Sequence, residues 1–178
     1  MQLRAPLLRR LLARVNALEP DLIVITGDIF DFDPSYIEEG CRELAELDAP
    51  LGVFAVLGNH DTYTGADAVA LGLETWTRIR LLRNDWVRIE LEGGALALAG
   101  VEDPGHGWNE RDGTHEALER LASEIPADLS RLLLIHRPSW FGQAARLGFP
   151  LALAGHTHGG QIALPRPGQH HNVSRLIS

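Results

Sequence analysis

LIVITGD (residues 22–28) sets the fold class, because its uninterrupted apolar run ends abruptly in glycine and aspartate. A strand exposed on one face alternates apolar and polar residues, whereas a strand covered on both faces is apolar throughout. We therefore expect a buried strand with Asp28 at its carboxyl end. Three further stretches share this pattern of an apolar run that ends in a side chain able to bind a metal: residues 53–61, 132–136 and 151–158.

Helical patterns separate most of these apolar runs, and alternation of buried strands with helices is typical of an α/β fold. Residues 80–101 differ, because an alternating segment, a Glu-Gly-Gly turn and a second apolar segment predict an antiparallel hairpin. We therefore expect a mixed β-sandwich flanked by helices, in one domain over residues 1–178. From Pro165 onward the composition predicts loop. The helices are expected at about 35–47, 66–79, 114–122 and 139–147.

The polar ends of the four apolar runs form the candidate functional site. In open α/β sheets, ligands bind beyond the carboxyl ends of the strands, so these side chains converge if the strands are parallel neighbours. Imidazole together with carboxylate suits first-row divalent metals such as Mn, Fe, Zn or Ni. The residues expected at this edge are Asp28, Asn59, His60, Asp61, His136, His156 and His158.

Taken one at a time, these residues also fit purely structural roles. A Gly-Asp pair after a strand is commonly a turn, residues 59–61 fit a helix cap, and His136 fits a hydrogen-bonded core histidine. His156 and His158 are different, because they stand two residues apart before two glycines that let backbone approach a ligand closely. The combination favours a metal site over a set of unrelated structural roles.

Composition narrows the class of protein. Of the 178 residues, 45% are hydrophobic and 22% charged, as in an ordinary globular domain. The formal net charge of −8 disfavours nucleic-acid partners. A single cysteine, Cys41, excludes an internal disulfide framework and a cysteine-rich zinc site.

The first 18 residues form a basic amphipathic pattern, with leucines at helical spacing and arginines between them. Such a pattern is found in transit peptides and in helices that lie on membranes. It is also found in helices that pack on a sheet, and Glu19-Pro20 followed at once by an apolar strand favours this packed helix. Because a helix that feeds a buried parallel strand normally follows another strand, we expect a first strand to be lacking.

The ordered motifs resemble those of calcineurin-like metallophosphoesterases. The resemblance rests on Gly-Asp at 27–28, Gly-Asn-His-Asp at 58–61, His136 and Gly-His-Thr-His-Gly-Gly-Gln at 155–161. The last motif is similar to the YkuE-like phosphodiesterase branch of that family. The resemblance implies hydrolysis of a phosphoester, more specifically a phosphodiester, by a hydroxide bound to two divalent metals. It also implies a small substrate such as a lipid head-group or nucleotide-sugar compound.

The resemblance assigns roles by position. Asp28 is expected to bridge two metals, with Asn59, His136 and His156 completing one site and His158 binding the other metal. His60 is expected above the metals, where it protonates the leaving group or stabilises phosphoryl charge. Asp31 resembles the carboxylate that orients this histidine, and Asp61 is the competing candidate.

One family motif is missing from this sequence: no Asp-x-His triplet precedes Asp28. That triplet supplies two ligands to the metal that His158 binds, so we expect one complete metal site. We also expect a fragment or short form that lacks the first strand and the C-terminal strands. Members of the branch that this sequence resembles often carry an N-terminal signal or membrane segment, and such a segment would lie in the missing part. The compartment stays open between cytoplasmic and membrane-associated. The alternative hypothesis is a non-catalytic metal-binding or scaffold remnant of the same fold.

Overall fold

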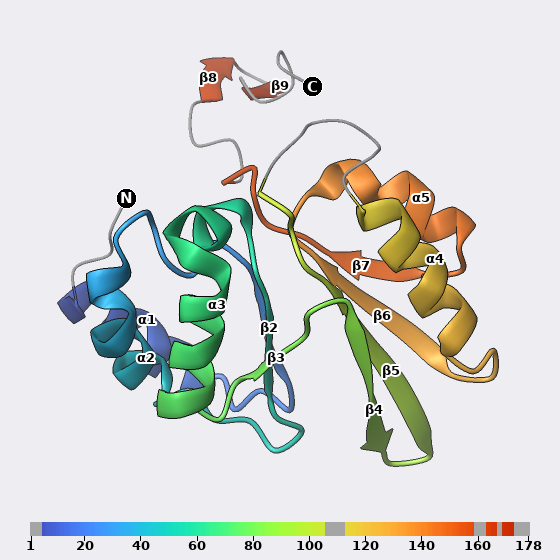
Figure 1. Ribbon diagram of the computed structural model, residues 1–178, viewed down its shortest axis with the longest axis horizontal. Coiled ribbons are helices and arrows are strands. Elements are labelled where there is room, and N and C mark those ends of the chain that lie inside the picture. Colours follow the sequence, from blue (N-terminus) through green and yellow to red (C-terminus); the bar gives the residue numbers. More distant parts are fainter. Residues whose placement is uncertain (1–4, 106–112, 159–162, 167–168, 173–178) are drawn as a thin grey trace.

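A computed structural model describes residues 5–105, 113–158, 163–166 and 169–172 of the chain. The described chain forms four layers, with helices outside and two β-sheets packed face to face between them (Figure 1). This arrangement confirms the predicted mixed α/β sandwich.

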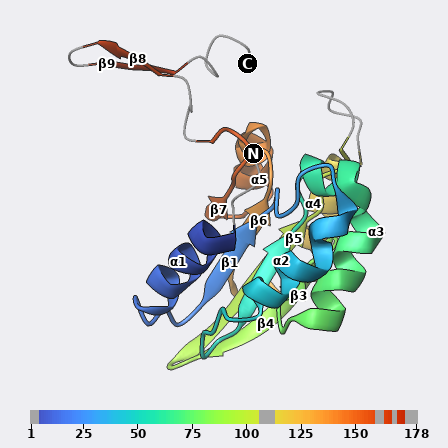
Figure 2. The same cartoon turned by 90° about the vertical axis from the view of Figure 1, so that its left-hand side faces the viewer.

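The first sheet is parallel and has the strand order β1-β2-β3. Its outer face packs against α1, α2 and α3, which lie together on one side of the molecule (Figure 2). Apolar residues at helical spacing form the core of this layer, including Leu12, Cys41 and Leu73. The strands are β1 (Ile23–Thr26), β2 (Val53–Val56) and β3 (Arg80–Leu81), and the helices are α1 (Ala5–Asn16), α2 (Ile37–Leu44) and α3 (Asn59–Trp76).

The second sheet is mixed and has the order β4-β5-β6-β7. The β4–β5 hairpin is antiparallel, as predicted, whereas β5, β6 and β7 are parallel. Two helices cover its outer face, where Leu118 and Leu121 meet Leu133. The strands are β4 (Asp85–Leu91), β5 (Gly94–Val101), β6 (Ser130–Ile135) and β7 (Leu151–Leu153), and the helices are α4 (Thr114–Glu124) and α5 (Phe141–Arg146).

A third apolar core joins the two sheets. Val56 of β2, Leu98 of β5 and Leu134 of β6 are fully buried within it. The sheets approach closely at Gly100, because a Cβ atom there would collide with the Leu82 side chain. Burial of both faces explains why these strands are apolar throughout.

The structure differs from the predicted element boundaries in three places. The hairpin begins at Asp85 rather than at residue 80, because Arg80 and Leu81 form β3 and pair parallel with β2 in the first sheet. Helix α3 begins at Asn59 rather than near residue 66, and Gly65 interrupts it with a φ of +119°. A glycine in the left-handed region breaks the helical periodicity, so only the second half was predicted. The prediction of loop after Pro165 was wrong, since β8 (Ala163–Arg166) and β9 (Gln169–Asn172) pair antiparallel.

Helix α1 packs on the first sheet, as the packed-helix interpretation predicts. Leu12 is buried, and Leu8 and Val15 pack against the same core. Arg9 forms a surface ion pair with Glu43 of α2. In the part of the chain that the structure describes, no helix has the length and hydrophobicity needed to cross a membrane.

Two short 3-10 helices precede α2 and α5, over Pro34–Tyr36 (η1) and Pro138–Trp140 (η2). Proline opens both turns, where its fixed φ is compatible and its missing N–H costs no helical hydrogen bond. In η1, the Asp33 carboxylate caps the turn by accepting from the Ser35 amide at 3.0 Å.

Candidate metal centre

The turn after β1 delivers Asp28. Gly27 and Asp28 both have left-handed backbone, with φ of +91° and +56°. A Cβ atom on Gly27 would lie 2.5 Å from the Gly58 nitrogen and 2.7 Å from His136 Nδ1, so only glycine fits. This close approach brings Asp28 beside the loop that follows β2.

The start of α3 delivers Asn59, which is buried. Asp61, two residues later, has a fully buried carboxylate that accepts hydrogen bonds from the amides of Gly58 and Phe30, each at 2.8 Å. Burial raises the pKa of Asp61 above its ordinary value, although these amide bonds oppose the shift. Asp61 therefore ties the loops after β1 and β2 together.

His136 follows β6 and is almost completely buried. Its Nδ1 lies 2.8 Å from the Thr26 carbonyl oxygen, which belongs to β1 in the other sheet. A carbonyl oxygen only accepts, so Nδ1 carries the proton and neutral His136 presents a lone pair on Nε2. A backbone bond between the sheets thus fixes both the tautomer and the direction of the ring.

Four donor atoms converge at this point. His136 Nε2 lies 3.1 Å from Asn59 Oδ1, 3.1 Å from His156 Nδ1 and 3.3 Å from Asp28 Oδ1. His156 Nδ1 lies 2.9 Å from Asn59 Oδ1. Ligands bonded at about 2.1 Å to one cation, at right angles, are about 3.0 Å apart. The spacing and the mixed N/O donor set therefore fit a first-row divalent cation.

Charge in the cluster agrees with this fit. Burial alone would raise the pKa of Asp28, but the hydrogen bond and charge of His136 hold it below its ordinary value. Burial lowers the pKa of His156, and the positive charges of His136 and Arg137 lower it further. Burial opposes protonation of His136, yet its hydrogen bond to Asp28 raises its pKa. A proton and a cation would both bind the Nε2 lone pair of His136, so the two compete for this position.

His60 lies at the exposed rim of the cluster. Its Nδ1 is 2.6 Å from Asp31 Oδ1, and its backbone amide donates to Asp28 Oδ1 at 3.1 Å. Of the two carboxylates that the sequence left in competition, Asp31 contacts the His60 ring, whereas Asp61 accepts from backbone amides. The geometry thus supports Asp31 as the partner of His60.

His158 does not join the converging group. The group consists of Asp28, His136 and His156, with Asn59 beside them, while His158 is exposed and has a φ of +52°. Its predicted role as a ligand of a second metal stays a prediction. The Gly-Gly-Gln that completes its motif, at 159–161, lies outside the described residues.

The sequence interpretation missed an ion pair beside the site. The Arg137 guanidinium donates to both oxygens of the Asp103 carboxylate, at 2.5 and 2.9 Å, and both residues are buried. The Asp103 amide also bonds to the Leu57 carbonyl at the end of β2. Asp103 follows the apolar strand β5, so the pattern of a strand ending in a carboxylate was a usable signal.

Comparison with known proteins identifies the family. The family model described as calcineurin-like phosphoesterase matches residues 4–160. The chain belongs to this family. This metallophosphoesterase is 34% identical over 161 residues to the metallophosphoesterase YkuE of Bacillus subtilis, covering 89% of this chain and 54% of YkuE.

Two further relatives show how widely the domain occurs. A Bos taurus protein named as a transmembrane protein with a metallophosphoesterase domain is 35% identical over 164 residues, covering 83% of this chain and 35% of that protein. A Campylobacter jejuni metallophosphoesterase is 32% identical over 155 residues, covering 87% and 40%. This metallophosphoesterase therefore spans between about a third and just over half of the length of these three relatives.

A solved crystal structure shares the fold with a TM-score of 0.58 at 15% sequence identity, covering 94% of this chain and 84% of that one. At that identity the likeness supports the architecture alone. Family membership makes a divalent metal the expected cofactor of this metallophosphoesterase, and the four converging donors are the residues that fit it.

Proposed function

We propose that this chain hydrolyses phosphoesters, with a preference for phosphodiesters, at the cluster of Asp28, Asn59, His136 and His156. The observation that carries the proposal is the convergence of four lone-pair donors, at 2.9–3.3 Å, from loops of two different sheets. Atoms that all present lone pairs repel one another unless a proton or cation lies between them. Such an arrangement is a usual property of a metal site and an unusual one for a structural core.

The bound cation supplies charge stabilisation for the phosphoryl oxygens and lowers the pKa of an adjacent water. The Asn59 amide contributes a neutral oxygen, so the ligand set carries one negative charge, on Asp28. A site with few anionic ligands leaves the cation electrophilic. His136, fixed by the Thr26 carbonyl, holds its donor atom in place while substrate binds.

His60 is suited to transfer a proton at the rim. With Nδ1–H directed to the Asp31 carboxylate, the ring atom left for substrate is Nε2. In the imidazolium form, Nε2–H donates its proton to the leaving oxygen as the P–O bond breaks, and the ring becomes neutral. The Asp31 carboxylate fixes the orientation of the His60 ring through its contact with Nδ1.

Two properties support a diester rather than a monoester. A diester carries one negative charge where a monoester carries close to two, and Asp28 and Asp31 both lie at the site. The Gly-His-Thr-His-Gly-Gly-Gln motif also resembles the YkuE-like phosphodiesterase branch. Lipid head-group diesters and nucleotide sugars are the substrate classes to screen.

The test compares Mn²⁺-dependent hydrolysis of bis(p-nitrophenyl) phosphate and of p-nitrophenyl phosphate by the purified chain. We expect the diester to have the higher kcat/KM, and Asp28→Ala and Asn59→Ala each to remove the activity. Arg88→Ala is the control, because Arg88 lies exposed on the hairpin and pairs with Glu90. Full activity in both site variants would overturn the proposed mechanism.

A second candidate is metal binding without turnover. The described residues gather one converging ligand group, and His158 lies outside it. That geometry is also compatible with a single cation that stabilises the fold and takes no part in catalysis. Elemental analysis after Mn²⁺, Fe²⁺, Zn²⁺ or Ni²⁺ loading, together with the hydrolysis assay, separates metal binding without turnover from catalysis. Tight binding of one metal without hydrolysis of either substrate supports the second candidate.

A further inference from the structure

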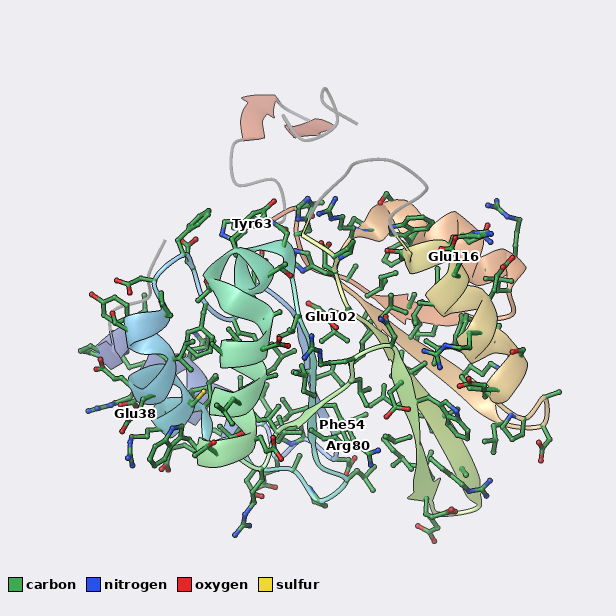
Figure 3. The ribbon with its side chains drawn as sticks, viewed as in Figure 1. Glu38, Phe54, Tyr63, Arg80, Glu102 and Glu116 are labelled. Atoms are coloured by element: carbon green, nitrogen blue, oxygen red, sulfur yellow. The ribbon has the colours of Figure 1, made fainter. Side chains whose placement is uncertain are left out.

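An exposed aromatic pair borders the proposed active site. Phe32, in the loop after β1, and Tyr63, in the first turns of α3, stack with ring centroids 5.7 Å apart and planes 12° apart. Phe32 exposes 61% of its surface and Tyr63 exposes 47%. Figure 3 shows Tyr63 projecting at the end of α3 where the helix begins. Two large aromatic side chains are therefore held together at the surface rather than buried.

Both rings of the aromatic pair lie beside the His60 ring. The Phe32 ring lies edge-on to the His60 ring, with centroids 5.0 Å apart and planes at 62°, and the Tyr63 ring centroid is 6.0 Å from that of His60. His60 is the side chain proposed to protonate the leaving oxygen. Whatever group that oxygen carries must therefore lie close to the aromatic pair.

The backbone holds both rings in place. The Tyr63 hydroxyl donates to the Gly105 carbonyl oxygen at 2.7 Å, which fixes the far end of that ring. Phe32 has a φ of +60°, a left-handed conformation that is strained for an aromatic residue. Strain combined with exposure of an apolar ring is not explained by core packing, and such combinations concentrate at functional sites.

The electrostatic surroundings limit what binds there. Asp31 and Asp33 flank Phe32 in sequence, and the hydrogen bonds to Ser35 keep the pKa of Asp33 below its ordinary value. Two carboxylates beside the pair disfavour a second anionic group in this position. An uncharged planar group has a ring face for stacking and no charge to repel.

We propose that Phe32 and Tyr63 form a stacking platform that selects phosphoesters whose leaving group is planar and uncharged, such as an aryl or nucleobase-bearing alcohol. The inference rests on the proposed function, because it places the scissile phosphate at the four-residue cluster. Phe32 and Tyr63 are specificity-determining residues in this assignment and take no part in proton transfer.

Calorimetric titration of the Zn²⁺-loaded chain with phenyl phosphate and with methyl phosphate tests the platform without requiring turnover. In the unaltered chain, phenyl phosphate is expected to bind about 5-fold more tightly than methyl phosphate, a typical gain for an aromatic contact. Phe32→Ala should remove that preference and leave the affinity for methyl phosphate unchanged. Phe32→Leu, which keeps apolar surface without a ring face, should retain only part of it.

Two variants serve as controls. Tyr36→Ala removes an exposed tyrosine of η1 and should leave the phenyl-to-methyl ratio unchanged. Tyr63→Phe keeps the ring and removes the hydroxyl bond to Gly105, so it should keep most of the preference.

The possible results distinguish failure of the stacking platform from failure of the proposed function. Equal affinity for the two ligands in the unaltered chain, or an unchanged ratio in Phe32→Ala, overturns the platform and leaves the proposed phosphate site standing. If neither ligand binds the Zn²⁺-loaded chain, the proposed function fails and the platform fails with it.

Discussion

The two halves of the metal centre are built in different ways. The first sheet contributes oxygen donors, Asp28 and Asn59, on loops that its own residues fix through the buried Asp61 carboxylate. The second sheet contributes imidazoles, and His136 depends on a carbonyl of the first sheet for its orientation. The oxygen half is therefore preformed by one sheet, whereas the imidazole half becomes competent only when the sheets pack together.

A glycine at the interface shows that the imidazole half depends on how the two sheets pack together. Gly155, beside His156, donates its amide to the His136 carbonyl at 3.1 Å. A Cβ atom on Gly155 would lie 3.0 Å from Thr26 Oγ1 and 3.2 Å from the Thr26 carbonyl oxygen. The imidazole loops therefore press against the end of β1, and metal binding should report on the packing of the sandwich.

The largest expected effect follows from removing an imidazole. His136→Ala should weaken Zn²⁺ binding by more than about 100-fold, since even the loss of a residue that only hydrogen-bonds a ligand commonly costs about 10- to 100-fold. Calorimetry on the unaltered and variant chains measures this effect. His115→Ala is the control, because His115 is a partly exposed histidine of α4 that pairs with Glu119, away from the metal centre. Equal affinity in His136→Ala would contradict the assignment of the imidazole half.

A cation that joins the two halves should stabilise the whole sandwich. Ligand binding to the folded state alone contributes about 4 kcal/mol when free ligand reaches about 1,000 times its Kd. We therefore expect saturating Zn²⁺ to raise the midpoint of urea unfolding in the unaltered chain and to leave it nearly unchanged in Asp28→Ala. A rise of equal size in both proteins would show that the cation binds elsewhere.

Asp61 and Asp31 should separate into a structural and a positioning role. Asp61→Ala leaves two buried amides without their carboxylate, and each such loss costs about 1–3 kcal/mol. We expect the free energy of unfolding to fall by about 3 kcal/mol. Asp31→Ala removes the partly exposed contact with His60. This variant should change the free energy of unfolding by less than about 1 kcal/mol, while lowering kcat. Equal stability of the two variants would remove the distinction between them.

Cys41 provides the smallest expected effect and a probe of the first sheet by itself. It is fully buried on α2, and burial raises the pKa of its thiol from 9.0 to about 11. The group is deprotonated more readily in the unfolded chain, so its contribution to stability is complete below pH 9 and declines as the pH approaches 11.

Labelling of the native thiol at about pH 8 should therefore be slow, and saturating Zn²⁺ should slow it further if the two halves open together. Labelling that Zn²⁺ leaves unchanged would mean that the first-sheet helices open without disturbing the metal centre. That result would show that the helices of the first sheet form the less stable part of the molecule.

Most of the elements and all four converging donors follow from local patterns in the sequence. Runs such as residues 22–28 reveal burial on both faces, because every side chain along the strand is apolar, and the polar residue at each end is visible in the sequence. The hairpin of β4 and β5 was likewise predictable from alternation and a Glu-Gly-Gly turn.

How those elements combine depends on tertiary contacts that no local pattern records. The four polar-ended runs are not four neighbours in one sheet: β1 pairs with β2, β6 pairs with β7, and the donors meet where the two sheets face each other. Tertiary contacts also selected Asp31 over Asp61 as the partner of His60 and joined Arg137 to Asp103. The physical reason is that periodicity records how much of a segment is buried, whereas the partner across an interface depends on packing between residues far apart in the chain.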